Sequence, residues 1–383
     1  MQHELADIAI VGVGQSDFRA LYAPTDRPRD AYGLAAAALR EAIEDCGIDK
    51  DEIDGLLTCR IQYDRFATVA GLPNPRFVHD LEGTGRMSGI ALQEAAALIS
   101  SGMVDVVACV YGNNGRSSKV KYGGEGAGPT TAYDEMYGMT SPGAYVGLMY
   151  QRYRGMYGAG DDALAPLAIN NRRHAALNPV AVLQKEFTRE EYLNSRYIAE
   201  PLRLLDYCLI NDGAVAFIVT SVERARSLRK TPVRVAGTAG MGHVTNYYTA
   251  EDFFYSACQD VASRLYEQTG VAPEEVDCLQ IYDNFTPTIL FTLEGFNHAP
   301  RGEAWQWVDE EKIRHDGPRP LNTAGGHTSE SYMQGWAHHV EAVRQLRGEA
   351  GARQVPGCST VQYMCASPIV TSHILTNDEA VAR

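Results

Sequence analysis

The chain has 383 residues, which is enough for two domains of ordinary size. Its apolar content of 45% is ordinary for a globular protein and excludes wholesale disorder. With 34 basic and 48 acidic residues it carries a formal net charge of −14, which argues against nucleic acid and anionic membranes as partners. An anionic ligand would therefore need a local group of basic side chains.

The cysteine pattern and the apolar runs bear on the compartment. Eight cysteines are scattered along the sequence without a C-x-x-C pair, and several lie in apolar runs, as Cys109 does in VVACVY. This pattern predicts buried, reduced thiols in a cytoplasmic protein. The opening residues lack a basic segment and a small-residue cleavage site, so we predict no signal peptide. No apolar run approaches the roughly 18 residues of a membrane-spanning helix, so we expect a soluble protein without a membrane partner.

The first 112 residues alternate between strand and helix. Ile8–Gly14 is apolar and predicts a strand, and the Ala-rich residues 29–48 predict a helix that ends at Gly47. A short acidic turn and a second strand follow in residues 49–59. Another helix begins at residue 87; it is apolar on most faces, so we expect it between two layers. The near-continuous apolar run Val104–Tyr111 predicts a strand that is covered on both faces. This alternation favours an α/β fold with parallel strand pairs.

The composition changes between residues 113 and 199. Glycine, tyrosine, serine, threonine and proline are frequent there, and only the stretch at 144–158 has clear helical spacing. We interpret 113–199 as a loop-rich insertion with some helix that lies over the core, because insertions of this size commonly form lids or binding surfaces. The apolar pattern of a strand returns at Tyr207–Ser221.

The second half of the sequence repeats the first. Pro232–Gly240 resembles the opening strand, and a helix end, an acidic turn and a strand recur in the same order. Matching residues keep the same offsets: Gly47, Glu52, Ile53 and Asp54 correspond to Gly270, Glu275, Val276 and Asp277. Such a duplication predicts two pseudo-symmetric halves, with a site at the seam between them. We therefore divide the chain into an N-terminal half (1–112 and 200–228), the insertion (113–199) and a C-terminal half (229–383).

Several long stretches resemble the thiolase superfamily, and more narrowly its sterol-carrier and lipid-transfer branch. They include IAIVGVGQSDF, SPGAYVGLMYQRYRGMYG, AINNRRHAALNP, SRYIAEPLRLLDYCLINDGAVAFIV, YDNFTP and GGHTSESYMQG, in this order along nearly the whole chain. The resemblance implies a thiolase-like α/β fold of two pseudo-symmetric halves in five layers (αβαβα). It also implies a CoA-thioester ligand and a homodimer.

The catalytic residues of thiolases do not carry over. Thiolases attack with a cysteine in a C-x-S-G pattern, where a helix N-terminus stabilises the thiolate, and LEGTGRMSGIAL places Arg86 at that position. Counting from the paired glycines of GGHTSESYMQG places Tyr332 on the thiolase histidine. The H-D-x-F motif of the branch reads Y-D-N-F here, with Tyr282 in place of its histidine. The covalent nucleophile is missing, and two phenols stand where two histidines would.

Two tyrosines in this arrangement resemble a subgroup of thiolase-like aldolases that cleave steroid side chains held as CoA thioesters. The resemblance implies retro-aldol cleavage of a β-hydroxyacyl-CoA, a 17-hydroxy-steroid-20-carboxyl-CoA that gives a 17-keto steroid and propionyl-CoA. It also implies a small OB-fold partner with a zinc ribbon, in a heterotetramer. Retro-aldol chemistry needs an acid and a base rather than a nucleophile. The sequence leaves open which tyrosine is the base; we favour Tyr332, with Tyr282 as its partner for the other proton transfer. We expect no cofactor besides the CoA of the substrate.

Neighbouring residues of the two motifs have more open roles. His327 could polarise a carbonyl or make a structural hydrogen bond, and Asp283 could orient Tyr282 or cap a turn. Gly325 and Gly326 shape the loop that carries Tyr332. Cys365 falls near the second cysteine of thiolases, but the usual glycines are absent, and we favour a buried structural thiol.

Other motifs are less specific. Arg116, Lys119 and Lys121 could hold the CoA phosphates, although a solvated loop explains them slightly better. VGVGQSDF lacks the third glycine of a dinucleotide-binding loop. His243 and the pair His338–His339 lack metal-ligand spacing, so we predict no metal in this chain.

Two other function classes remain open. The chain could be an acyltransferase that uses Cys365 or Cys109, or a non-catalytic subunit that binds acyl-CoA or lipid. Products separate them: thiolysis consumes free CoA, retro-aldol cleavage does not, and a binding protein turns nothing over.

Overall fold

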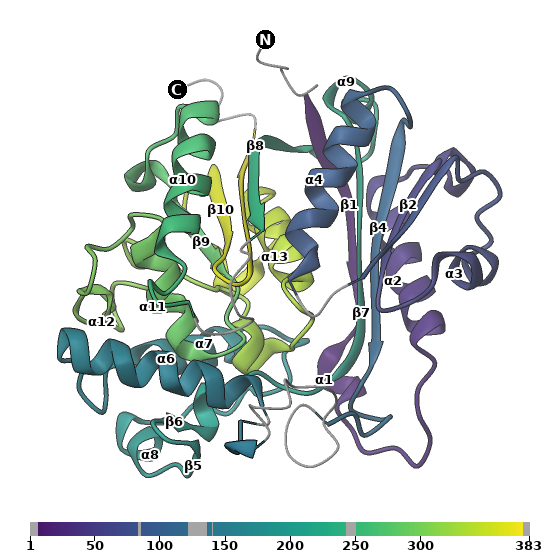
Figure 1. Ribbon diagram of the computed structural model, residues 1–383. Coiled ribbons are helices and arrows are strands. Elements are labelled where there is room, and N and C mark those ends of the chain that lie inside the picture. The colour runs from purple at the N-terminus through teal and green to yellow at the C-terminus, as the bar shows by residue number, and fades with distance from the viewer. Residues whose placement is uncertain (1–6, 83–85, 122–135, 140, 243–249, 378–383) are drawn as a thin grey trace.

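A single mixed sheet organises the molecule, which is described by a computed structural model covering residues 7–82, 86–121, 136–139, 141–242 and 250–377 (Figure 1). The sheet has nine strands in the order β3-β2-β4-β7-β1-β8-β11-β10-β9. The N-terminal part holds β1 (Ile8–Gln15), β2 (Gly55–Cys59), β3 (Phe77–Leu81), β4 (Val106–Asn114) and β7 (Asp212–Ser221). The C-terminal part holds β8 (Val233–Gly242), β9 (Cys278–Ile281), β10 (Thr360–Cys365) and β11 (Ile369–Thr376).

The two parts of the sheet have the same connections. In the first, β1 is antiparallel to β7 and β7 to β4, and β4, β2 and β3 are parallel. In the second, β8 is antiparallel to β11 and β11 to β10, and β10 is parallel to β9. Among the strands described, the C-terminal part has no counterpart of β3; instead, a parallel bridge joins Leu279 of β9 to Leu321, in the place where β3 pairs with β2. The first strands of the two parts, β1 and β8, pair antiparallel and join them. The duplication predicted from the sequence is thus confirmed.

Helices and the two parts of the sheet alternate in five layers: outer helices, one part of the sheet, central helices, the other part of the sheet, and outer helices. On the outside, α2 (Ala31–Cys46) packs on the N-terminal strands and α10 (Tyr255–Thr269) on the C-terminal strands. Between them, α4 (Met87–Ser100) and α13 (Trp336–Leu346) each contact strands of both parts (Figure 1). The outer helices end alike, since Gly47 and Gly270 adopt left-handed backbone angles at the C-cap. The thiolase-like fold is therefore confirmed.

The central position of α4 follows from its sequence. Alanine, leucine and isoleucine occur on most of its faces, and Ala91, Leu92 and Ala95 are fully buried. The helix also approaches the sheet closely, because a Cβ added to Gly89 would lie 2.2 Å from Oγ1 of Thr371 on β11. A side chain at this position would push α4 away from β11.

Shorter elements connect and cover this frame. They are α1 (Phe18–Leu21), α3 (Tyr63–Ala70), α9 (Val222–Ala225), α11 (Thr286–Gly295) and α12 (Ala304–Trp307), with 3-10 turns at Lys50–Glu52, Leu204–Asp206, Pro273–Glu275 and Gly351–Arg353. The label η4 denotes a π-helix, Gly326–Glu330, that leads into the second tyrosine motif.

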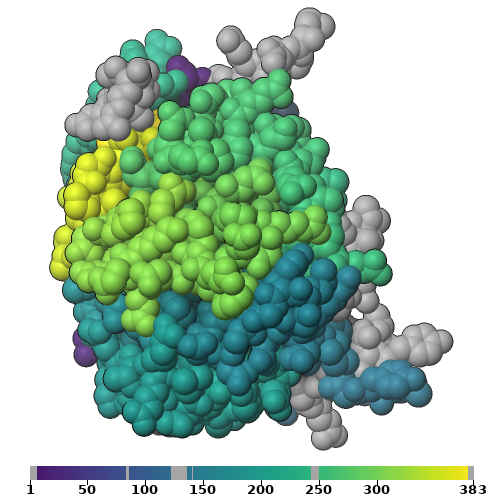
Figure 2. Space-filling model, turned by 90° about the vertical axis from the view of Figure 1, so that its left-hand side faces the viewer, coloured from purple at the N-terminus to yellow at the C-terminus, as the bar shows by residue number. Residues whose placement is uncertain are grey.

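The predicted insertion contains helices, a small hairpin and extended chain. Its described part holds α6 (Pro142–Tyr157), α7 (Ala165–Ala176), α8 (Arg189–Leu193) and β5 (Tyr197–Ala199), which pairs with β6 (Leu202–Arg203). Residues 122–135 and 140 lie outside the described residues. In Figure 2 this segment, in blue and teal, covers the lower part of the face whose upper part is the green C-terminal half. Helix α7 contacts η4, so the segment supports one wall of the site.

The cysteines and the helix lengths can be compared with the apolar pattern of the sequence. All eight cysteines are free, and seven of them are buried. In the described part of the chain, every helix is too short or too polar to cross a bilayer.

Candidate active site

Two tyrosine hydroxyl groups meet where the two motifs of the second half converge. Tyr282 follows strand β9, and its backbone N–H donates to the Met364 carbonyl, which extends the ladder between β9 and β10. Tyr332 follows η4, the π-helix that ends at Glu330. The two phenolic oxygens are 2.9 Å apart and hydrogen-bonded. Tyr282 is 3% exposed whereas Tyr332 is half-buried, so Tyr332 is the outer member of the pair.

The paired glycines before Tyr332 are required by the backbone. Gly325 and Gly326 have φ angles of 107° and 58°, in the region that disfavours side chains. A Cβ on Gly325 would lie 2.7 Å from Cβ of Ala175 in α7, and one on Gly326 would lie 2.2 Å from Oδ2 of Asp283. The turn therefore brings η4 against both α7 and the chain that carries Tyr282.

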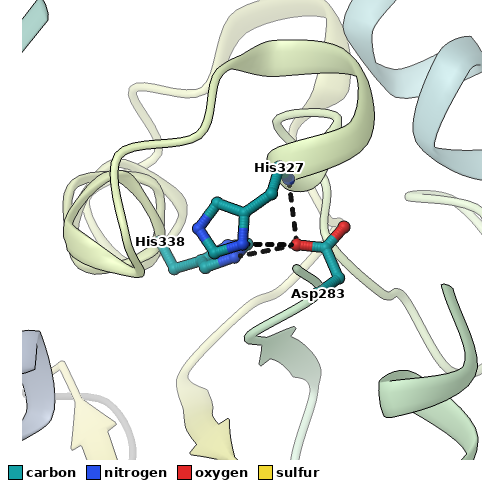
Figure 3. Close-up of side chains that lie close together, drawn as sticks. All are labelled: Asp283, His327 and His338. Carbon is teal, nitrogen blue, oxygen red and sulfur yellow. Dashed lines mark hydrogen bonds and ion pairs between the residues drawn. The ribbon is translucent and has the colours of Figure 1, made fainter. Parts of the chain in front are cut away.

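Asp283 anchors this turn from inside the protein. Its Oδ1 accepts a hydrogen bond of 2.9 Å from the His327 backbone N–H, and its Oδ2 accepts one of 2.7 Å from the Asn171 side chain. The His327 Nδ1 and His338 Nε2 lie 3.1 and 3.3 Å from Oδ1 (Figure 3). Burial favours the neutral carboxyl, but these imidazoles outweigh it and hold the pKa of Asp283 down to about 2.

The same three side chains, Asp283, His327 and His338, have the ligand types and proximity of a metal site. Their nearest ligand atoms all lie within 4.8 Å of one another, and all three residues are buried (Figure 3). The Gly335 backbone N–H donates to His327 Nε2 at 2.8 Å, however, and a backbone amide can only donate. Burial lowers the pKa of His327 to about 4, so its ring is neutral and carries its one proton on Nδ1. That nitrogen has no lone pair for a metal.

We interpret this cluster as a carboxylate–imidazole anchor. The Nδ1–H of His327 is not well aligned with Oδ1, so the contact is electrostatic rather than a well-formed hydrogen bond. The ring of His327 packs edge-on against both Tyr282 and Tyr332, with centroids 4.8 and 5.0 Å away. His327 thus positions the tyrosines and has both ring nitrogens directed into the protein. That the chain holds no metal stays a prediction.

Burial and charge set the acidity of the inner tyrosine. Burial raises the pKa of Tyr282 well above its usual value, and the neighbouring Tyr332 adds to this rise. The positive charge of Arg86 lowers that pKa and offsets part of the rise. Arg86 is the N-cap residue of α4 and is only 6% exposed. The residue in the place of the thiolase nucleophile is therefore a buried cation beside the tyrosine pair.

Cys365 lies in the same small cluster as Tyr282 and Tyr363, with Tyr332 packed against it. Its Sγ is 3.4 Å from Oγ of Ser367, and burial raises the pKa of the thiol to about 11. A thiol of this pKa is almost fully protonated at neutral pH and is a poor nucleophile.

The structure adds residues that sequence reasoning did not select. Tyr363 is fully buried, and its hydroxyl is 3.1 Å from Oγ of Ser88 at the start of α4. Strand periodicity could have indicated it, because Tyr363 lies two residues before Cys365 and shares its face of β10. Asn171 and His338 gave no such signal, since they reach Asp283 from α7 and α13.

The basic loop lies apart from the tyrosines. The guanidinium of Arg116 stacks on the ring of Tyr22 at 3.5 Å, and its Nε donates to the Tyr22 carbonyl. A pocket of about 200 Å³ is lined by Ala23, Pro24, Thr25, Arg116, Ser117, Lys119 and Asp212. Part of the Arg116 charge is thus engaged within the protein, and binding of CoA phosphates by Arg116, Lys119 and Lys121 stays a prediction.

Comparisons with known proteins agree with this geometry. A family model described as "Thiolase C-terminal domain-like" matches residues 240–374. A 17-hydroxy-3-oxo-4-pregnene-20-carboxyl-CoA lyase of Mycobacterium tuberculosis is 32% identical, covering 96% of this chain and 98% of the lyase. A steroid side-chain-cleaving aldolase of Thermomonospora curvata is 34% identical, covering 89% of this chain and 90% of the aldolase.

Solved structures give the same result. A structure described as "Ltp2-ChsH2(DUF35) aldolase" superposes with a TM-score of 0.88 at 31% identity, covering 99% of this chain and 100% of that one. Human mitochondrial 3-ketoacyl-CoA thiolase, at 13% identity and a TM-score of 0.69, shares the fold. The resemblance identified from the motifs is confirmed: the chain belongs to the thiolase superfamily, in its branch of thiolase-like aldolases.

Proposed function

We propose that the chain cleaves a carbon–carbon bond of a β-hydroxyacyl-CoA by a retro-aldol reaction. The proposed substrate is a 17-hydroxy-steroid-20-carboxyl-CoA, the class that the name of the Mycobacterium tuberculosis lyase indicates, and the second relative is named as a steroid side-chain-cleaving aldolase. The observation that carries this proposal is the hydrogen bond between Tyr282 and Tyr332. Arg86, the N-cap residue of α4, stands at the sequence position where a thiolase has its cysteine. This arrangement offers proton transfer and charge stabilisation without a covalent nucleophile.

The reaction balances with one proton moved between two sites. A base takes the proton of the 17-hydroxyl group, the C17=O bond forms, and the C17–C20 bond breaks. Its electron pair passes to C20 and the thioester carbonyl as an enolate, and the proton is then delivered to C20. The products are a 17-keto steroid and propionyl-CoA, and free CoA is not consumed.

Burial supports Tyr332 as the base. The raised pKa of the deeply buried Tyr282 keeps its hydroxyl protonated, so that it can donate the 2.9 Å hydrogen bond to an ionised Tyr332. Ionising a phenol with a pKa of about 10 at pH 7 costs about 4 kcal/mol. A hydrogen bond to a charged group contributes about 1.5–3 kcal/mol of this, and a nearby cation supplies more.

Burial also argues against an acyltransferase. Cys365 and Cys109 are both 0% exposed, and burial raises the pKa of each thiol, that of Cys109 well above its usual value. Cys109 lies within β4, away from the tyrosine cluster. A non-catalytic acyl-CoA-binding role is the remaining alternative, and turnover decides it.

We also propose that the chain acts as a homodimer with a small OB-fold partner, in a heterotetramer. The similar solved structure is named as an aldolase with a DUF35 protein, which supports a partner of this kind. No cofactor besides the CoA of the substrate is proposed.

Product analysis of the purified complex tests the function. The chain is co-expressed with its OB-fold partner and given β-hydroxyacyl-CoAs of differing bulk without free CoA. A ketone and a shorter acyl-CoA should appear in equal amounts, and Tyr332→Phe should lower kcat by about 10²–10⁴-fold. Tyr63→Phe, at an exposed tyrosine on α3, is the matched control and should keep full activity. Absolute dependence on free CoA, or no turnover of any such substrate, would contradict the proposal.

A further inference from the structure

Residues 207–211 form a short segment before β7 that lies along the first tyrosine motif, Y-D-N-F. Tyr207 makes an antiparallel bridge with Phe285, the last residue of that motif. The Cys208 N–H donates to the Asn284 carbonyl at 3.1 Å. Two consecutive residues of the segment are thus fixed to the motif, so the start of the segment follows any movement of the chain after the inner tyrosine.

The other end of the same segment contacts the second tyrosine motif. The Leu209 N–H donates to the His327 carbonyl at 3.0 Å, and Nδ2 of Asn211 donates to Oγ of Ser331 at 2.8 Å. Ser331 directly precedes Tyr332 in the chain. The segment therefore joins the two motifs, and the hydrogen bond from Asn211 is made one residue before the outer tyrosine.

Asn211 is itself held by the sheet of the N-terminal half. It is 1% exposed, and its carbonyl accepts a 2.8 Å hydrogen bond from Nδ2 of Asn113 on β4. The next residue, Asp212, begins β7. Ser331 is fully buried, so water cannot readily take the place of Asn211 at its hydroxyl. A side chain fixed on one half of the molecule thus holds the loop of the other half.

Ser331 connects η4 to the outer tyrosine. Its φ and ψ angles of −175° and 143° are those of extended backbone that any residue adopts, so its own conformation does not lock it. Each residue has two soft backbone angles, and a rotation at Ser331 would move the Tyr332 hydroxyl away from that of Tyr282, 2.9 Å away. Anchoring the Ser331 side chain removes this freedom.

We propose that Asn211 is a positioning residue, which holds Ser331 and thereby keeps the Tyr332 hydroxyl within hydrogen-bond distance of Tyr282. The inference rests on the proposed function. It also divides the labour between the two halves: the C-terminal half supplies both phenols, and the N-terminal half fixes the distance between them. Asn211 acts through Ser331 and Tyr332 rather than on the substrate.

Steady-state kinetics of single and double variants test this role in the complex with the partner. Misplacing a proton-transfer group by about 1 Å costs about 10²-fold, so Asn211→Ala should lower kcat by about 10–10²-fold and leave KM unchanged. Ser331→Ala removes the other end of the same bond and should have the same effect. The double variant should be no slower than the slower single variant. Losses that multiply in the double variant would show that the two side chains act separately, and would overturn the proposal.

Asn170→Ala is the matched control. Asn170 is fully buried, and its Nδ2 donates to the Leu321 carbonyl at 3.0 Å. In Asn170, as in Asn211, Oδ1 has no partner among the described residues. The control should lower the urea midpoint as Asn211→Ala does and still keep the wild-type kcat. An equal loss of kcat in Asn170→Ala would mean that destabilisation alone explains the effect, which would overturn the role of Asn211.

A second measurement follows the loop without turnover. Tyr332 is half-buried, so releasing Ser331 should let tetranitromethane nitrate Tyr332 faster in Ser331→Ala than in the wild type, whereas the exposed Tyr63 should react at the same rate in both. Nitration is read for each tyrosine by mass spectrometry of peptides. Ser331→Ala deletes one oxygen atom, so it also covers the case in which Asn211→Ala folds poorly.

The two measurements separate this inference from the proposed function. Wild-type kcat in both single variants, or an unchanged nitration rate of Tyr332 in Ser331→Ala, would overturn the role of Asn211 while leaving the retro-aldol function intact. A wild-type complex that cleaves none of the substrates would instead refute the proposed function.

Discussion

Gly335 is the residue on which the packing of the tyrosine site depends most directly. It is buried, has a φ angle of 87°, and is the N-cap residue of α13. Its N–H donates to His327 Nε2, and its carbonyl accepts from His339 Nδ1. Replacing it by alanine would place a methyl group 2.6 Å from Ser88 Oγ, 2.6 Å from the Tyr363 hydroxyl and 3.2 Å from Tyr282 Cδ2. The added methyl group would therefore lie too close to α4, to β10 and to Tyr282 at the same time.

The expected loss has two parts. A side chain in the left-handed region costs about 1–2 kcal/mol, and an added methyl group in a close-packed core costs about 1–3 kcal/mol more. We expect Gly335→Ala to lower the free energy of unfolding by about 2–5 kcal/mol. A ring of Tyr282 displaced by about 1 Å should lower kcat by about 10²-fold.

Gly348→Ala is the matched control. Gly348 has a φ angle of 71° and is exposed, and no atom lies within 4 Å of an added Cβ. This variant therefore measures the cost of the backbone strain without a steric clash. Urea unfolding followed by tryptophan fluorescence gives the stability of both variants, and ketone release gives kcat. Equal stability losses in the two variants, with full activity in Gly335→Ala, would refute the close packing of α4, β10 and Tyr282.

Three further predictions concern single side chains. Cys365→Ala should keep its kcat, because a buried thiol with a pKa of about 11 is not the nucleophile; a complete loss of ketone release would show otherwise. Burial raises the pKa of Glu330 from 4.5 to about 8, so the folded protein holds this proton where the unfolded chain releases it. Its contribution to stability is complete below pH 4.5 and is lost as pH rises through 8, and urea midpoints of Glu330→Gln should fall less between pH 5 and 9 than those of the wild type. Asp283→Asn weakens the charged hydrogen bonds that Asp283 accepts from the His327 backbone and the Asn171 side chain, and it should cost about 1.5–3 kcal/mol of unfolding free energy, measured in urea; an unchanged midpoint would contradict the anchor.

Much of the fold could be predicted because its signals are local and repeated. The glycines Gly47 and Gly270 stop equivalent helices at equivalent places, which the sequence displays as a fixed offset. Residues 87–100 are apolar on most faces, which predicts a helix between two layers, because no polar face is left for solvent. These features need no knowledge of distant contacts.

The site could be predicted only in part, for the opposite reason. The motifs gave Tyr282 and Tyr332 individually, but their 2.9 Å hydrogen bond depends on how the turn at Gly325 and Gly326 brings η4 against the chain that carries Tyr282. The carboxylate–imidazole anchor joins Asp283, His327 and His338 from three segments, so no local spacing could reveal it. The stacking of Arg116 on Tyr22 likewise joins residues that are far apart in the sequence. Residue type and spacing identify groups, whereas the tertiary contacts decide which groups are free to bind a ligand.

Mass spectrometry of the working complex tests the central claim most directly. A β-hydroxyacyl-CoA is supplied without free CoA, and the intact protein and the small-molecule products are weighed during turnover. Proton transfer by Tyr332 and Tyr282 predicts equal amounts of ketone and shorter acyl-CoA, with a protein mass that never changes. An acyl group that accumulates on any cysteine of the chain would contradict it.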